Sequence, residues 1–293
     1  MRFGPPPPRP FTKAEMAAIM NPPTRIQTLR NVVSTAADNL GPIADLGKPY
    51  VDGLDNLPRD GRFLLVGNHT QAGVETLLIP YYVRRELGVL VRPLADRGFG
   101  QLRGLAGDLL AAAGAVVGHP DSAGELMAHD ETVLVFPGGG REIAKFKGEE
   151  YRLRWDGRSG FARMAIQFDY PIVPVALVGG DDVYRPLTER DSAWGRLTEA
   201  IGRRLGGPPG GMPLVRGVGP TLIPRPERMY LRFCEPIDTT KPARRQASIW
   251  EAKIKELTQN SLEGALTDLQ QLRSEDPYRG LNPLAWRSAA QPA

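Results

Sequence analysis

A histidine follows a short apolar stretch and precedes an acidic residue in Gly67-Asn68-His69-Thr70-Gln71-Ala72-Gly73-Val74-Glu75. Histidine can accept a proton near neutral pH, and a carboxylate on its second ring nitrogen would fix the tautomer and stabilise the imidazolium. A continuous helix would turn His69 and Glu75 onto different faces, because six residues rotate by about 600°. The two side chains can therefore meet only if a helix begins after His69. The alternative interpretation is a helix N-terminus with Thr70 as its cap and Glu75 favourable to the dipole.

Three glycines and an arginine follow another apolar stretch, in Phe136-Pro137-Gly138-Gly139-Gly140-Arg141-Glu142. Consecutive glycines allow close backbone approach, and their N–H groups can converge on an anion or a developing oxyanion. The guanidinium of Arg141 suits a phosphate or a carboxylate. The segment lacks the GK[ST] ending of a phosphate-binding Walker loop. It predicts an oxyanion or anion site, and a flexible turn is the alternative.

Basic residues surround these glycines and would suit the phosphates of a nucleotide-like donor, although a solvated charged face is equally compatible with them. They are Lys145, Lys147, Arg152, Arg154, Arg158 and Arg163. Other catalytic routes have little support, because the sequence contains no Gly-x-Ser-x-Gly elbow. Cys234 lies in an alternating apolar run typical of a core strand, and no spacing of His, Cys and carboxylates suggests a metal site.

The composition is that of a globular protein, with 293 residues, 41% apolar and 24% charged. The 37 Lys and Arg against 33 Asp and Glu give a net charge of +4, which is too small for a committed nucleic-acid binder. The single cysteine excludes an internal disulfide. The longest uncharged apolar stretches, Leu109–Gly118 and Tyr170–Gly180, are shorter than the roughly 18–20 residues that span a bilayer. We therefore expect a soluble protein or one that lies on a membrane surface.

Apolar periodicity predicts an α/β arrangement. The expected strands are Arg62–Val66, Ala115–Val117, Thr132–Phe136, Ile172–Val178 and Met229–Phe233. The expected helices are Thr12–Met20, Thr24–Leu40, Gly73–Leu87, Phe99–Ala113, Ser122–Ala128, Ser159–Phe168 and Ser192–Arg204. We expect Met1–Pro10 to be an extended proline-rich arm and Leu205–Pro226 to be a loop. Ala243–Arg273 is expected to form either a helix pair or one long helix.

We expect one α/β domain over residues 46–240, between helical extensions at 1–45 and 241–293. The helix expected at Thr24–Leu40 carries an apolar stripe flanked by Arg25 and Arg30. Such a stripe either packs on the body of its own protein or lies on a membrane surface.

Three blocks, taken in order, resemble the signature motifs of the phospholipid/glycerol acyltransferase superfamily. They are Asn68-His69 with an acid downstream, the glycine segment from Phe136 to Arg141, and Tyr170-Pro171-Ile172-Val173-Pro174-Val175. The similarity spans roughly residues 51–237. Within it, residues 138–184 resemble the branch that acylates mono- and diacylglycerols and related alcohols.

The chain departs from the family pattern at three points. The commonest family block has its acid five residues after the histidine, where this sequence has Val74; the longer spacing to Glu75 resembles phytyl ester synthase-like members. The family's Phe-Pro-Glu-Gly block has a glycine at position 138 here, so Glu142 is the carboxylate that could act instead. Residues 114–119 lack the arginine that helps to bind phosphate-bearing acceptors, which favours a neutral alcohol.

The resemblance implies a mixed central sheet flanked by helices, as in glycerol-3-phosphate acyltransferase, with no metal or cofactor. It implies acyl transfer from a thioester, with acyl-CoA as substrate, to a hydroxyl of a glycerolipid or another lipid alcohol. His69 would be the general base and Glu75 its orienting acid. Oxyanion stabilisation or substrate binding would fall to Asn68, Gly138, Gly139, Gly140, Arg141 and Glu142.

With no credible serine or cysteine nucleophile, we expect direct transfer without an acyl-enzyme. The alternatives are a lysophosphatidate acyltransferase, a thioesterase, or a non-catalytic lipid-binding protein on the same scaffold. The expected partners are acyl-CoA, a lipid alcohol and a peripheral membrane surface, with no nucleic acid. The expected location is the cytoplasm, at the inner face of the membrane.

Overall fold

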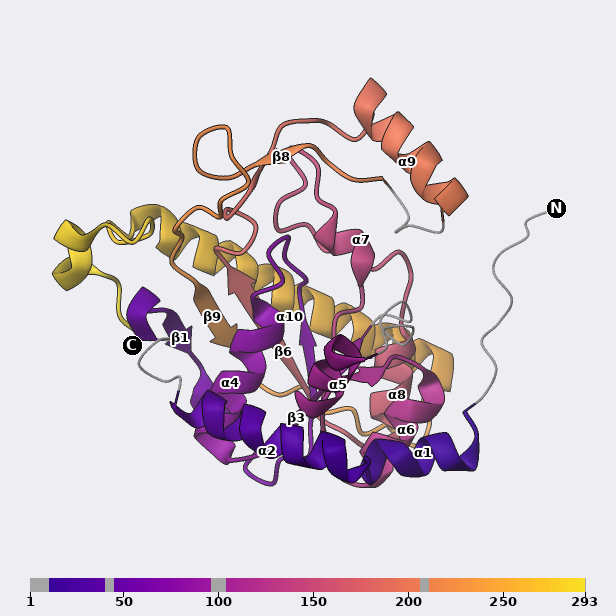
Figure 1. The fold of residues 1–293 in the computed structure, drawn as a ribbon. Helices are drawn as coiled ribbons and strands as arrows, with labels where there is room; N and C mark the ends of the chain where they lie inside the picture. The colour runs from indigo at the N-terminus through magenta and orange to yellow at the C-terminus, as the bar shows by residue number, and fades with distance from the viewer. Residues whose placement is uncertain (1–10, 40–44, 96–103, 206–210, 293) are drawn as a thin grey trace.

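A seven-stranded mixed sheet forms the centre of the molecule (Figure 1). The computed structural model describes residues 11–39, 45–95, 104–205 and 211–292. The strands are β1 (Tyr50–Asp52), β2 (Leu64–Gly67), β3 (Val91–Ala95), β4 (Val116–Val117), β5 (Thr132–Val135), β6 (Ile172–Val178) and β9 (Tyr230–Phe233), in the spatial order β1-β9-β6-β2-β5-β3-β4. The five strands from β6 to β4 are parallel, β9 runs antiparallel to β6, and β1 is parallel to β9. The α/β class with a mixed sheet, expected from the sequence, is confirmed.

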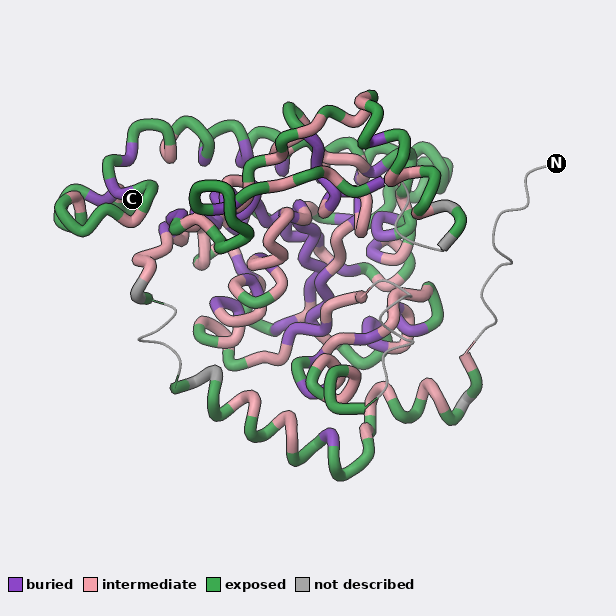
Figure 2. The backbone as a smooth tube through the Cα atoms, turned by 45° about the horizontal axis from the view of Figure 1, so that its top comes forward, coloured by how far each residue is buried: buried purple, intermediate pink, exposed green. Residues whose placement is uncertain are grey.

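Helices cover both faces of this sheet. They are α1 (Lys13–Met20), α2 (Thr24–Asn39), α4 (Glu75–Leu87), α5 (Leu105–Ala112), α6 (Pro120–Ala128), α7 (Gly140–Ile143), α8 (Gly160–Phe168), α9 (Ala193–Leu205) and α10 (Ala247–Glu275), with short 3₁₀ turns at Asp45–Gly47, Leu54–Asn56 and Pro283–Ser288. Buried residues of α6, α8 and α10 share one apolar cluster, and those of α4 lie in another. All seven residues of β6 are buried, and they alternate between the two clusters. Figure 2 shows the buried backbone running through the centre of the molecule.

Most of the predicted elements are present, with informative exceptions. The C-terminal segment forms one long helix, α10, which is the second of the two expected alternatives. The predicted loop contains the strand β8 (Val215–Arg216), which pairs with β7 (Arg185–Pro186). Strand β3 was not predicted, because Arg92 and Pro93 interrupt its apolar run; Arg92 is nevertheless buried and donates hydrogen bonds to two backbone carbonyls.

Some predictions fall outside the described residues. These are the proline-rich arm at 1–10, the start of the expected helix at Phe99–Ala113, and residues 206–210 of the expected loop. No helix in the described ranges is both long enough and apolar enough to cross a bilayer.

The second N-terminal helix packs against the body of the protein. Helix α2 lies against α5, where the Arg25 guanidinium is 2.7 Å from Asp108 Oδ1. Arg30 donates a hydrogen bond of 3.2 Å to the carbonyl of Ala111. These contacts support packing on the protein itself, the first of the two interpretations of the α2 stripe.

A buried ion pair fastens the C-terminal end of α10 to the sheet. Arg228, just before β9, lies 2.5 Å from Asp276 Oδ2, and both side chains are buried. Arg228 also donates to the carbonyls of Lys48 and Ala290, and Tyr230 donates to Asp276. Burial alone would raise the pKa of Asp276, but these donors outweigh it and hold the pKa below its ordinary value.

We expect Asp276→Ala to lower the free energy of unfolding by about 3–5 kcal/mol, because it leaves the Arg228 charge buried without its partner. The pair contributes its full stability above the ordinary aspartate pKa, and this is lost as pH falls through the lower pKa of the folded state. The difference in the free energy of unfolding between wild type and variant should therefore become smaller below about pH 4. Urea unfolding across pH 2–7 measures both effects.

The matched control is Asp268→Ala, which removes an exposed α10 carboxylate that lies 3.1 Å from Arg232. Exposed pairs contribute about 1 kcal/mol or less, so this change should be small. Equal losses in the two variants would contradict the importance of the buried pair.

Candidate active site

Three loops meet at one edge of the sheet. They follow β2, β5 and β6, which are parallel neighbours, so their carboxyl ends lie side by side. The loop after β2 carries His69, the loop after β5 carries the glycine segment, and the loop after β6 carries Asp181. The carboxyl edge of parallel strands is where α/β proteins usually place their binding sites.

His69 and Glu75 are brought together as the spacing required. Helix α4 begins at Glu75, after the histidine. The Glu75 carboxylate is fully buried and accepts hydrogen bonds from Nδ1 of His69 and from the hydroxyl of Thr70. A carboxylate can only accept, so Nδ1 carries the proton and Nε2 is left as an acceptor. Nε2 has no hydrogen-bond partner in the described parts of the chain.

The alternative interpretation of this segment, with Thr70 as a helix cap, is wrong. The N-cap of α4 is Val74, which makes no side-chain capping bond. Thr70 instead supplies the second donor to Glu75. Its close packing depends on Gly180, where a Cβ atom would lie 2.5 Å from the Thr70 hydroxyl.

An aromatic ring covers one face of the His69 imidazole. Phe136 stacks on His69 with ring centroids 4.6 Å apart and an interplanar angle of 17°. From the sequence, Phe136 was expected only to end a strand and to begin the glycine segment. The signal was its position directly after β5, beside the strand that ends at the histidine.

Glu142 binds the backbone of the loop that carries the histidine. It is buried and accepts hydrogen bonds from the backbone N–H of His69 at 2.9 Å and of Arg154 at 2.8 Å. Burial raises its pKa above the ordinary value, although those two donors and nearby Lys145 partly oppose the shift. A Cβ atom at Gly138 would lie 2.2 Å from Cδ of Glu142. The Glu142 carboxylate therefore fills the space that a side chain at position 138 would need.

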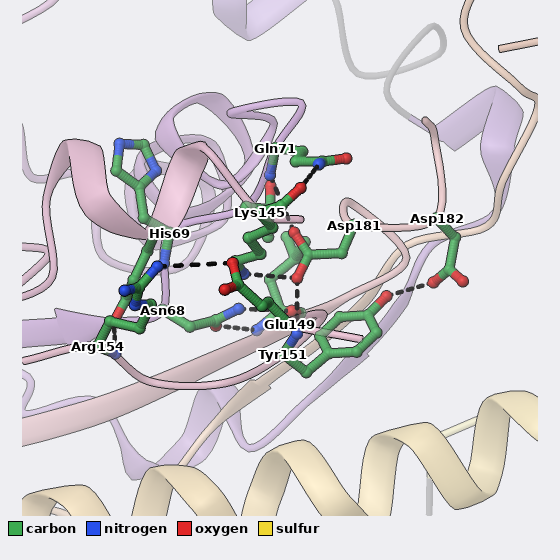
Figure 3. Close-up of polar contacts among 12 residues, drawn as sticks. Asn68, His69, Gln71, Lys145, Glu149, Tyr151, Arg154, Asp181 and Asp182 are labelled. Carbon is green, nitrogen blue, oxygen red and sulfur yellow. Dashed lines mark hydrogen bonds and ion pairs between the residues drawn. The ribbon is translucent and has the colours of Figure 1, made fainter. Parts of the chain in front are cut away.

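A third buried carboxylate, Asp181, holds the next part of the same loop (Figure 3). It accepts from the N–H of Gln71 at 2.9 Å, from Nζ of Lys145 at 2.5 Å and from the N–H of Tyr151 at 2.9 Å. Gln71 in turn donates to the carbonyl of Lys145 at 2.7 Å. This cluster was not predicted, because Asp181 belongs to no recognisable sequence motif.

Several predicted site residues do not face the histidine ring. The buried Asn68 amide is bonded to both the N–H and the carbonyl of Leu177, so it ties β2 to β6. Arg141 pairs with Asp156 at 2.8 Å. In the glycine segment, the N–H of Gly139 donates to the carbonyl of Phe136. The N–H groups of Gly138 and Gly140 have no acceptor among the described residues.

The basic stretch is largely engaged in structural contacts. Lys145 is buried against Asp181, Arg154 lies 3.5 Å from Glu149, and Arg163 pairs with Glu251. Arg158 donates to the carbonyl of Pro137. Four of the six charges are therefore engaged in contacts within the protein.

A polar cavity of about 1010 Å³ lies beside the loops, on the other side of Asp181. Four of its lining cations have no carboxylate within 4.0 Å among the described residues; they are Lys147, Arg185, Arg216 and Arg279. No cluster of three His, Cys, Asp or Glu side chains suited to a metal ion occurs in the described ranges. The described residues thus offer a histidine–carboxylate pair and a separate cationic cavity, and Asp181 both lines that cavity and binds the histidine loop through Gln71.

Residues 48–178 match the family model described as Acyltransferase. This segment belongs to the acyltransferase family. The match begins just before β1 and ends with β6, so it includes the His69 loop and the glycine segment.

The chain is also similar to longer curated proteins. An uncharacterised protein of Mycobacterium leprae is 33% identical over 201 residues, which make up 65% of this chain and 51% of that protein. Chloroplastic phytyl ester synthase 1 of Arabidopsis thaliana is 30% identical over 256 residues, 79% of this chain and 35% of the synthase. The chain thus spans about half the length of the mycobacterial relative and about a third of the synthase.

Among solved structures, the 1-acyl-sn-glycerophosphate acyltransferase of Thermotoga maritima shares 15% identity, with a TM-score of 0.47. The aligned part covers 84% of this chain and 79% of that one.

We expect Glu142→Ala to lower the free energy of unfolding by about 1–3 kcal/mol, because it leaves two buried N–H donors without an acceptor. Adding Gly138→Glu should recover part of this loss, since the new carboxylate enters the vacated space. Chemical denaturation of the single and double variants measures both steps.

Gly138→Ala provides the control for this replacement. It should destabilise the wild type, where its Cβ collides with Glu142, and have little effect in the Glu142→Ala background. Gly160→Ala should be tolerated in both, because no atom lies within 4 Å of its added Cβ. Additive effects of the substitutions at positions 138 and 142 would show that the two residues do not share this space.

Proposed function

We propose that the protein transfers a fatty acyl group from acyl-CoA to a hydroxyl of a glycerolipid or another lipid alcohol. The observation that carries this proposal is the pairing of His69 with the buried Glu75, which leaves Nε2 as a free acceptor. The membership of residues 48–178 in the acyltransferase family supports the same class of reaction.

In the proposed mechanism, Nε2 of His69 removes the proton of the acceptor hydroxyl as its oxygen attacks the thioester carbonyl. Glu75 stabilises the resulting imidazolium through Nδ1, and Thr70 holds the second carboxylate oxygen. The tetrahedral intermediate then collapses with cleavage of the carbon–sulfur bond. The imidazolium returns its proton to the leaving thiolate, so the histidine ends the cycle neutral.

The oxyanion of that intermediate needs donors that are not already bonded. The N–H groups of Gly138 and Gly140 meet this condition, whereas that of Gly139 is engaged with Phe136. We therefore assign oxyanion stabilisation to the first two, which would act by the usual electrostatic effect of preorganised donors.

The cationic cavity is the proposed site for the phosphates of the donor. Lys147, Arg185, Arg216 and Arg279 supply positive charge there, and the cavity adjoins the histidine loop through Asp181. A thioester bound with its phosphates in this cavity would extend past Asp181 toward His69. Guanidinium and ammonium groups are the usual ligands of such phosphates.

The acceptor is proposed to be a neutral lipid alcohol. The similarity to a phytyl ester synthase supports this choice. The absence of an arginine from residues 114–119 supports it further, because phosphate-bearing acceptors need a cation.

We expect His69→Ala to reduce acyl transfer by about 10²–10⁴-fold, since the reaction loses its base. Glu75→Gln should be nearly as harmful, because its amide would donate to Nδ1 and place the proton on Nε2. The assay uses purified protein with radiolabelled acyl-CoA and separates the products by thin-layer chromatography. The acceptors are diacylglycerol, a long-chain alcohol and lysophosphatidate.

His129→Ala is the matched control, because the ring of this exposed histidine contacts only the carbonyl and the carboxylate of Glu125 among the described residues and should be dispensable. Free fatty acid as the product would identify a thioesterase, and preference for lysophosphatidate would identify the phosphate-acceptor alternative. Wild-type turnover in His69→Ala would exclude the mechanism, and tight acyl-CoA binding without turnover would identify a lipid-binding protein.

We expect Arg216→Ala to raise KM for acyl-CoA about tenfold with little change in kcat, because the phosphates contact the enzyme equally in the ground and transition states. An acyl thioester of N-acetylcysteamine lacks phosphates and should react equally well with wild type and variant. If Arg216→Ala raised KM equally for both thioesters, the phosphates of the donor would not be bound in this cavity. Steady-state kinetics with the two donors makes the comparison.

A further inference from the structure

An amphipathic helix stands away from the sheet at the catalytic end of the molecule. Helix α9 lies between β7 and β8, at the top of the view in Figure 1, near α7. We call the segment from β7 to β8, which includes α9, the flap. Strand β7 follows the carboxyl end of β6, and α7 follows that of β5, so the flap belongs to the edge of the sheet that carries His69.

The side of α9 that faces the protein is small and polar. Gly195 is buried, and a Cβ atom there would lie 2.1 Å from the carbonyl oxygen of Arg190. The hydroxyl of Thr198 bonds to both the N–H and the carbonyl of Met212. The helix is therefore held by backbone contacts and does not need its apolar side chains for attachment.

Those apolar side chains remain in solvent. Trp194, Leu197 and Ile201 lie on one stripe of the helix and are 42%, 53% and 46% exposed. Neighbouring segments continue the surface, because Trp194 bonds to the carbonyl of Met212 and the N–H of Leu187 bonds to Leu214. We call this set the flap surface; it consists of Leu187, Trp194, Leu197, Ile201, Met212 and Leu214, all exposed.

Positive charge borders the flap surface. The sequence of α9 contains three arginines and one glutamate. Arg196 and Arg204 are exposed and have no carboxylate within 4.0 Å among the described residues. An apolar stripe with a tryptophan and flanking arginines is the composition of helices that lie in the interface of an anionic bilayer.

We propose that the flap surface docks on an anionic phospholipid bilayer, with α9 parallel to the membrane plane. Docking there would turn the His69 edge of the sheet toward the lipid, where a long-chain acceptor resides. The biological purpose of this orientation rests on the proposed function, whereas the docking itself does not. Helix α2 lies along the bottom of the molecule in Figure 1, whereas α9 lies at the top. A molecule that docks through α9 would therefore keep α2 away from the membrane.

The test is co-sedimentation with vesicles of phosphatidylcholine that contain about 30% phosphatidylglycerol, compared with pure phosphatidylcholine. We expect the wild type to bind the anionic vesicles and to be released by about 0.5 M salt. The double variant Leu197→Glu/Ile201→Glu should bind at least about tenfold more weakly, because it places two carboxylates on the apolar stripe.

The matched control is Val32→Glu, which changes an exposed apolar residue of α2 and should bind like the wild type. A second variant, Arg196→Glu/Arg204→Glu, leaves the apolar stripe intact and should lose binding to anionic vesicles. It decides the question if the first variant does not fold, as judged by circular dichroism.

Turnover of a short, water-soluble acceptor separates this proposal from the proposed function, because the flap variants should retain it. Equal binding of wild type and flap variants, loss of binding in Val32→Glu alone, or absence of vesicle binding would each overturn the docking proposal. A wild-type dimer that the flap variants convert to a monomer, without vesicle binding, would also overturn it and identify an interface between two copies.

Discussion

Burial of negative charge is the constraint on which the loop that carries His69 depends. A carboxylate removed from water is stable only when donors replace its hydration. Three buried carboxylates, Glu75, Glu142 and Asp181, surround this loop. Each of them accepts a hydrogen bond from one of three consecutive residues, namely from the hydroxyl of Thr70 or from the N–H group of His69 or Gln71. The loop thus donates hydrogen bonds to the three carboxylates, and these hydrogen bonds in turn hold the loop in its conformation.

This arrangement leaves the histidine little freedom. Glu75 holds Nδ1, Glu142 holds the backbone, and Phe136 covers one face of the ring. These contacts fix the orientation of Nε2 of His69, the ring nitrogen that has no partner in the described residues. In the proposed mechanism, this preorganisation would spare the orientational entropy that a mobile base loses during reaction. The glycines at 138 and 180 matter for the same reason, because each leaves room for a side chain that binds Glu75 or the histidine loop.

The sequence was sufficient where one local pattern determines the structure. Uninterrupted apolar runs identified β6 and β5, and the spacing of His69 and Glu75 stated the condition under which they meet. It was insufficient where the cause is tertiary: β3 contains a buried arginine and a proline, and Asp181 lies 110 residues from its partner Gln71. The two interpretations of the basic stretch stayed open, because a count of charges does not tell which of them are paired. The role expected for the histidine came from the resemblance to a family, whereas the position of Glu142 in the space beside Gly138 is visible only in the structure.

The position of β9 between β1 and β6 governs the order in which the sheet can be assembled. Strand β1 has no other partner in the described part of the sheet, and its contact with β9 joins residues 180 positions apart, as Asp52 and Arg232 illustrate. During synthesis, β2, β5 and β6 emerge long before β9, so the outer side of β6 stays an open edge until residue 233 has left the ribosome. Such an edge invites pairing with other chains. The last strand to be made therefore closes the sheet, and α10 then covers the completed face.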